Sequence, residues 1–192
     1  MNDWQKALEV LKKGGIVIFP TDTAFGIGCR IDNRSSVERL FEIRKRPKNQ
    51  AMPVLVSSID MVKQYIRGGI REKVYILMKK YWPGALTLVL PANLQTVPSL
   101  VRGGRKTVGL RIADDSFLTQ VIEKLGVPIL GPSANFHGEE TPYRFEQISK
   151  ELIKKVDFVV YGKTKHVNTS TVLDVTKKKW KIIRQGAVSI DI

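Results

Sequence analysis

The feature that most constrains this chain is a recurring junction between a short apolar run and a proline-marked polar cluster. The apolar run 16–19 ends at Pro20, and the polar residues 21–23 follow it. Proline has no backbone N–H to donate, so it is confined to the ends and edges of sheets. The run 128–130 is likewise broken by a Gly-Pro pair before a second polar cluster. Because α/β folds hold ligands at strand ends, the pattern predicts an α/β fold with a binding site at these junctions.

Apolar residues at regular spacing indicate the other elements. Trp4, Leu8 and Leu11 recur at helical spacing, and Ser35 with Glu38 has the spacing of a capping box at the start of a second helix. A short lysine-rich turn separates the last two apolar runs, which predicts an antiparallel hairpin and therefore a mixed sheet. Further helices are predicted at 59–67, 71–81, 115–125 and 144–154, and strands at 16–19, 53–57, 86–90, 107–112, 128–130, 157–161, 170–175 and 180–184.

Length and composition favour a single cytoplasmic domain. The chain has 192 residues with 43% hydrophobic content, and it contains no repeat, low-complexity segment or flexible linker, so we expect one domain over residues 1–192. Cys29 is the only cysteine, which excludes an intramolecular disulfide and fits a reducing cytosol. The start lacks a basic segment followed by an apolar one, and no apolar run approaches the ~18–20 residues of a membrane span.

The net charge of the chain indicates anionic ligands but does not identify which anion binds. A formal net charge of +14 and a pI near 10 predict a basic surface that attracts polyanions in a salt-dependent way. Nucleotides and RNA both qualify. Lysines scattered evenly for solubility are the alternative explanation.

Several familiar site types are excluded by spacing. Cys29, His137 and His166 do not have the spacing of a zinc site, and we predict no metal ligands. The Gly26-Ile27-Gly28 string resembles the start of a dinucleotide fingerprint, but Ile31 stands where the third glycine is needed and no Walker-type string exists. GPSAN lacks the closing glycine of a hydrolase elbow. A bound nucleotide would therefore be held in another way.

Six strings together resemble the YrdC family, the threonylcarbamoyl-AMP synthases. They occur in the family's order and at similar spacing over nearly the whole chain. The chain departs from the family pattern at Arg44, where a lysine is usual, and at Gln185, where proline is common. The strings are PTDTAFG at 20–26, RKRPKNQAMP at 44–53, TVGLR at 107–111, GPSAN at 131–135, STVLDV at 170–175 and IIRQG at 182–186.

The resemblance implies a fold and a reaction. The fold would be a single YrdC-like domain with an open, twisted, mixed β-sheet flanked by helices, of the short type without the extra domains of larger relatives. The reaction would convert L-threonine, bicarbonate and ATP into threonylcarbamoyl-AMP and pyrophosphate, the first step toward threonylcarbamoyl-adenosine in tRNA. Other proteins would then transfer the group to tRNA. Mg²⁺ is compatible with ATP as substrate, but no residue is assigned to it.

In this reaction the carbamate formed on threonine supplies its own nucleophilic oxygen. The protein then has to align the substrates and stabilise negative charge, and arginine suits that task because its fork of donors matches phosphate or carboxylate oxygens. Arg44 and Arg46 flank one residue, so in an extended or irregular segment both point the same way and can hold one polyphosphate. We assign them the catalytic role. The alternative is a solvated cluster at a helix end.

The remaining site residues follow from the resemblance. Ser133 and Asn135 have an alternative, non-functional explanation as turn residues. Arg111 shares a strand face with Thr107, and its alternative explanation is an exposed arginine on a strand. Asp22 either orders its loop or assists a metal ion, and it is not assigned to catalysis. The implied ATP contacts are Arg46, Gln50, Thr107, Ser133, Asn135 and Arg184, and the implied L-threonine contacts are Thr23, Arg111, Ser133 and Ser170.

An RNA-binding module is the competing hypothesis from another class. In it, a basic concave face holds double-stranded RNA or tRNA, and any nucleotide site is secondary. Recognition directed at phosphates needs only lysines and arginines, and has no use for Thr23, Ser133 or Ser170. That contrast separates the two hypotheses.

Overall fold

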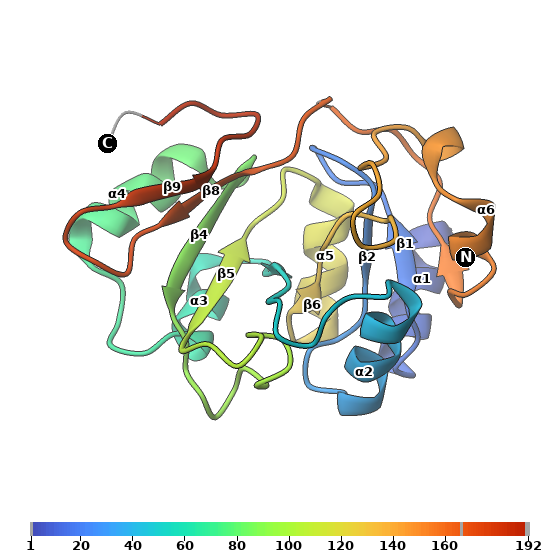
Figure 1. Cartoon of the computed structure of the whole chain (residues 1–192), viewed down its shortest axis with the longest axis horizontal. Coiled ribbons are helices and arrows are strands. Elements are labelled where there is room, and N and C mark those ends of the chain that lie inside the picture. The colour runs from blue at the N-terminus through green and yellow to red at the C-terminus, as the bar shows by residue number, and fades with distance from the viewer. Residues whose placement is uncertain (1, 166, 191–192) are drawn as a thin grey trace.

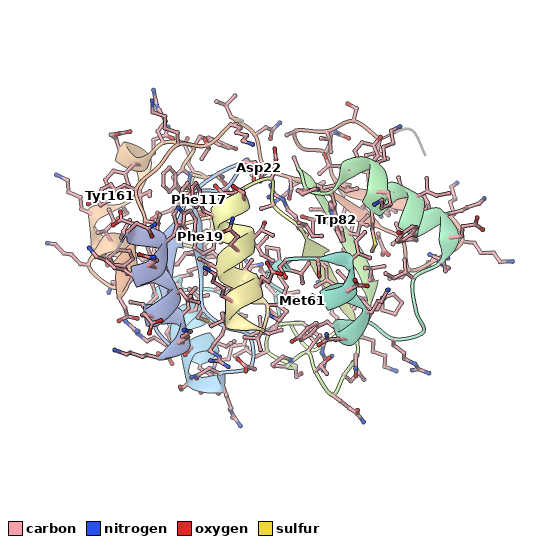
Figure 2. All side chains as sticks on the ribbon, turned by 180° about the vertical axis from the view of Figure 1, so that it is seen from behind. Phe19, Asp22, Met61, Trp82, Phe117 and Tyr161 are labelled. Carbon is pink, nitrogen blue, oxygen red and sulfur yellow. The ribbon has the colours of Figure 1, made fainter. Side chains whose placement is uncertain are left out.

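The computed structural model describes residues 2–165 and 167–190, so His166 lies outside it. Two β-sheets stand side by side, one with three strands and one with six (Figure 1). Helices α1, α3, α4 and α5 cover the face that Figure 2 shows from behind. The fold is the predicted α/β class.

The smaller sheet has the strand order β2-β1-β7. Strand β1 (Val17–Phe19) pairs antiparallel with β2 (Gly26–Gly28) and parallel with β7 (Phe158–Val159). Strand β2 was not predicted, because its two glycines carry no strand propensity. A Cβ on Gly28 would lie 1.9 Å from the Leu130 carbonyl oxygen, so only glycine permits this close approach.

The larger sheet is mixed, as predicted. Its order is β6-β3-β5-β4-β8-β9, with β3–β5 and β4–β8 parallel and the other pairs antiparallel. The predicted hairpin is confirmed, since β8 pairs antiparallel with β9. The strands are β3 (Val54–Leu55), β4 (Leu86–Pro91), β5 (Thr107–Arg111), β6 (Ile129–Leu130), β8 (Thr171–Asp174) and β9 (Lys181–Arg184).

The two sheets meet where β2 approaches β6. Isolated bridges join Gly26 to Ser133 and Arg30 to Ile129, and the Ile27 N–H donates to the Pro132 carbonyl at 2.9 Å. The strings around residues 20–26 and 131–135 are therefore adjacent in space although more than a hundred residues separate them in sequence. This seam positions the candidate site.

The helices lie where the sequence predicts them, but one predicted N-cap is wrong. The capping box predicted from Ser35 and Glu38 is wrong, because the N-cap of α2 is Asn33, whose side chain accepts from the Ser36 N–H at 3.1 Å. Glu38 instead pairs with Arg34. The helices are α1 (Asp3–Lys12), α2 (Arg34–Ile43), α3 (Ile59–Tyr65), α4 (Glu72–Tyr81), α5 (Ser116–Leu125) and α6 (Lys150–Ile153).

The helix predicted at 144–154 is interrupted. A single 3₁₀ turn, η1 (Phe145–Gln147), precedes α6, and Ile148 between them has an extended backbone with ψ 128°. Ile148 is buried in the core, so tertiary packing overrides local helix propensity there.

Two apolar clusters form the core. The larger joins β2, α2 and the six-stranded sheet with α3 and α4, and the smaller lies between α1, α5 and β1. In the described part of the chain, no helix is long and apolar enough to cross a membrane.

Candidate functional site

A pocket opens where the ends of β1, β5 and β6 and the start of β8 converge. It is lined by residues from all six of the strings that the sequence singled out. The predicted site residues that line it are Thr23, Arg44, Arg46, Arg111, Ser133, Ser170 and Arg184. Strand ends thus collect the polar clusters in one place, as the α/β pattern predicted.

Three predicted site residues are not among those lining the pocket. Gln50 contributes its carbonyl oxygen, which accepts from Arg46 Nε at 3.2 Å. Asn135 is buried and contacts Arg44. Thr107 starts β5, four residues from Arg111, which places it roughly 13 Å farther along the strand.

The hydroxyl group of Thr21 closes the polar turn after Pro20 with local hydrogen bonds. Thr21 Oγ1 accepts the N–H groups of Thr23 and Ala24 at 3.1 and 3.2 Å and donates to the Ala24 carbonyl at 2.7 Å. This is the Ser/Thr turn chemistry that lets a chain reverse directly after a strand. Thr23 Oγ1 is consequently held at the pocket wall.

Arg111 is held by this turn and by Gly84, which lies two residues before β4. Its Nε donates to the Gly84 carbonyl at 2.9 Å, its Nη1 donates to Thr23 Oγ1 at 2.8 Å, and its Nη2 forms an ion pair with Asp22. Both partners of the pair are buried. The alternative of an exposed strand arginine is therefore wrong. Burial lowers the pKa of Arg111, and the Asp22 carboxylate opposes that effect by favouring the charged form.

Asp22 orders its loop, which was one of its two expected roles. Its side chain lies beside the first turn of α5 in Figure 2, where it pairs with Arg111. Its second oxygen, Oδ2, is buried and has no hydrogen-bond partner within residues 2–165 and 167–190.

Arg44 is buried rather than solvated. The residue is 3% exposed at the C-cap of α2, and its Nε donates to the Asn135 carbonyl at 3.1 Å. Its Nη1 atom is buried and finds no partner in the described structure. Burial, followed by the neighbouring charge of Arg46, lowers the pKa of Arg44 to about 10, so the guanidinium is still charged at neutral pH. For Arg44, the alternative of a solvated helix-end charge is wrong.

Arg46 faces the same pocket from an irregular turn. Lys45 between the two arginines has a left-handed backbone with φ 52°, and its Nζ lies 4.8 Å from the centre of the Phe136 ring. Arg46 Nη2 donates to the Ala51 carbonyl at 2.6 Å, while its Nη1 is 3.4 Å from His137 Nδ1. The turn thus directs both arginines into the pocket and Lys45 elsewhere.

Ser170 connects the pocket to the β8–β9 hairpin. Arg184 donates to the Ser170 carbonyl from Nε and Nη2 at 3.1 and 2.9 Å. The Ser170 hydroxyl lies 2.9 Å from the hydroxyl of Thr87, a buried residue of β4 that lines the pocket. Sequence reasoning missed Thr87. A threonine inside the apolar run 86–90 was the signal that could have found it.

The pocket is strongly cationic. None of its lining residues is acidic. The Asp22 carboxylate does not line the pocket but forms an ion pair with Arg111, which does. Burial is the first cause of a lowered pKa in each lining arginine, so each would gain from an anionic partner. The arginines are Arg44, Arg46, Arg111 and Arg184. Among the described residues, no group of three or more His, Cys, Asp or Glu side chains is placed to hold a metal ion.

Chemically, the arrangement can hold a molecule with several negative charges beside a small polar one. Guanidinium forks suit phosphate or carboxylate oxygens, and the Thr23, Ser133 and Ser170 hydroxyls provide neutral donors and acceptors.

Comparison with known proteins agrees with this geometry. A family profile described as "Telomere recombination", covering Sua5, YciO and YrdC, matches residues 9–186. The threonylcarbamoyl-AMP synthase of Bacillus subtilis (strain 168) is 31% identical over 185 residues, which is 96% of this chain and 53% of that protein.

Two solved structures are close in fold. Sua5 of P. abyssi, crystallised with L-threonine, has 30% identity and a TM-score of 0.89, covering 95% of this chain and 54% of that one. E. coli YciO has 29% identity and a TM-score of 0.85, covering 97% and 90%. This chain thus spans about half the length of these two relatives, from B. subtilis and P. abyssi, and most of YciO. It belongs to the Sua5/YciO/YrdC family.

Proposed function

We propose that this protein is an L-threonylcarbamoyladenylate synthase, a nucleotidyltransferase that acts as a single domain over residues 1–192. The observation that carries the proposal is Arg44, which lines a cationic pocket and whose Nη1 is buried without a hydrogen-bond partner among residues 2–165 and 167–190. An unpaired buried donor on a charged group is costly, and a phosphate oxygen would satisfy it. A nucleoside triphosphate supplies such oxygens.

In the proposed reaction, the threonine amine first combines with bicarbonate to give a carbamate and water. A carbamate oxygen then attacks the α-phosphorus of ATP, forming a new P–O bond. The bond from the α-phosphorus to the bridging oxygen breaks, and pyrophosphate leaves with the electron pair. No nucleophile from the protein is needed, so catalysis consists of alignment and charge stabilisation.

The phosphate half of the pocket is assigned to Arg44, Arg46 and Arg184. Fixed guanidinium donors can hold the triphosphate and stabilise the charge that develops on pyrophosphate, without reorganising at the moment of reaction. Asn135 and Gln50 contribute through their bonds to Arg44 and Arg46. Thr107 remains a prediction from the family resemblance alone.

The amino-acid half is assigned to Thr23, Arg111, Ser133 and Ser170. Arg111 would bind the threonine carboxylate with the N–H groups that Thr23 and Asp22 leave free, because each Nη carries two hydrogens. The neutral hydroxyls would contact the threonine hydroxyl and its carbamate without adding charge. The P. abyssi relative crystallised with L-threonine supports a threonine site in this fold.

The product would serve threonylcarbamoyl-adenosine formation in tRNA, with the transfer made by other cytoplasmic proteins. A double-stranded RNA module is less favoured, because buried pocket residues such as Thr23 and Ser170 have no role in phosphate-directed recognition. ATP is a substrate in this proposal, and any Mg²⁺ would arrive with it.

Pyrophosphate release tests the proposal. The protein is incubated with ATP, bicarbonate and L-threonine, and each component is left out in turn. We expect release only when all three are present, and less with L-serine, because the lost methyl group forfeits roughly 1 kcal/mol of burial. Release at the same rate without threonine or without bicarbonate would refute the synthase assignment.

A further inference from the structure

A second charged surface lies at the other end of β8 from the pocket. It is a furrow lined by residues at the start of α4 and in the turn that joins β8 to β9. Figure 1 shows this turn at the outer end of the β8–β9 hairpin. We call this surface the basic furrow. Val175 at the turn is five positions after Ser170 in the pocket, or roughly 17 Å along an extended chain. Its lining residues are Arg71, Glu72, Lys73, Lys178, Lys179 and Trp180.

Basic side chains outnumber acidic ones along the basic furrow. Four of its six lining residues are cations and one is an acid, and Lys177 and Lys181 flank them in sequence. In the described part of the chain, none of these six cations forms an ion pair; the ion pairs there involve other lysines and arginines. Asp174, the last residue of β8, accepts hydrogen bonds from the Thr176 N–H and hydroxyl.

The furrow also has a fixed frame and an aromatic wall. Arg71 donates to the Val175 carbonyl and so ties α4 to the end of β8. Trp180 is half-buried, packs against the main core and lines the furrow. Lys177, Lys178 and Lys179 beside it are exposed. An aromatic ring among exposed lysines suits single-stranded nucleic acids, because bases stack on the ring while phosphates contact the cations.

We propose that the basic furrow binds a single-stranded nucleic acid, with an unpaired base on Trp180 and phosphates on Lys177, Lys178 and Lys179. An acidic protein segment would match the charge but would make no particular use of an indole face. A duplex would offer phosphates but no unstacked base. The site is separate from the pocket, so it does not depend on the proposed synthase activity.

Fluorescence anisotropy with a labelled 12-nucleotide oligouridylate tests this, with ATP and threonine absent. The variant Lys177→Ala/Lys178→Ala/Lys179→Ala should bind at least about tenfold more weakly, and its slope of log K against log salt should be smaller by about 2, from roughly 0.7 per lost phosphate contact. The matched control Lys6→Ala/Lys13→Ala/Lys124→Ala removes the same charge from exposed positions in and just after α1 and in α5. It should change binding less than about twofold.

Substitutions of Trp180 provide a second test of the proposal. Trp180→Ala should weaken binding by roughly tenfold, and Trp180→Tyr should restore most of it because a ring that can stack returns. Circular dichroism and thermal melting of each variant separate loss of binding from loss of folding.

Equal losses in the two triple-lysine variants would overturn the proposal, since they would mean attraction by net charge alone. Binding unchanged in Trp180→Ala, or polyglutamate bound as tightly with the same dependence on Trp180, would overturn it as well. Pyrophosphate release measured on the same furrow variants should match wild type, so failure of the furrow and failure of the synthase assignment are distinguishable.

Discussion

Replacement of Arg44 distinguishes two roles for its buried guanidinium, which are binding of phosphate and stabilisation of the fold. The Arg44→Ala variant loses the Nη1 donor, which has no partner among the described residues, and the Nε bond to the Asn135 carbonyl. A hydrogen bond from a charged donor contributes about 1.5–3 kcal/mol, and about 2 kcal/mol in the transition state corresponds to roughly a 30-fold lower rate. We expect that loss in kcat/KM for ATP.

The same substitution should cost little stability. An unpaired Asn135 carbonyl lowers the free energy of unfolding by about 1 kcal/mol, while removal of a buried cation whose pKa burial has lowered to about 10 acts in the opposite direction. Arg44→Lys keeps the positive charge at the position where the family usually has lysine. It should retain substantial synthesis with altered geometry.

Steady-state pyrophosphate assays and thermal melts on both variants decide the matter. Wild-type kcat/KM in Arg44→Ala would mean that the buried guanidinium has no role toward phosphate. If Arg44→Ala lowers both the activity and the melting temperature strongly, and Arg44→Lys restores neither, the role of Arg44 is structural.

Three further predictions follow from the contacts in and beside the pocket. Arg46→Ala should raise the KM for ATP most and Arg111→Ala the KM for threonine, and substrate titrations giving one pattern for both variants would refute this division. Thr87→Val keeps the side-chain volume but removes the 2.9 Å contact with the Ser170 hydroxyl, so the KM for threonine should rise roughly fivefold, about 1 kcal/mol, with the KM for ATP unchanged. Cys29 should resist thiol reagents at pH 8 until the protein unfolds, because burial raises its pKa to about 12 and keeps it protonated; rapid labelling of the folded protein would contradict its burial.

The strand ends were predictable because proline and glycine mark them directly in the sequence. The break after run 16–19 and the break after run 128–130 both fall at pocket walls, and the lysine-rich turn joins the hairpin that was predicted. Local signals of this kind depend only on backbone chemistry.

What the sequence did not reveal depends on contacts between distant segments. The burial of Arg44 requires Asn135, which is 91 residues away, and the ion pair of Asp22 requires Arg111, 89 residues away. Strand β2 exists because its glycines allow close approach to β6, which no propensity scale records. Asn33 outcompeted Ser35 as the N-cap because its carboxamide reaches the Ser36 N–H.

The most direct test of the central claim follows the bicarbonate carbon. The protein is incubated with ATP, L-threonine and ¹³C-bicarbonate, and the products are analysed by mass spectrometry. The proposed chemistry predicts threonylcarbamoyl-AMP carrying the ¹³C label, formed in proportion to pyrophosphate. Pyrophosphate released without labelled product, or AMP joined directly to the threonine carboxylate, would contradict it.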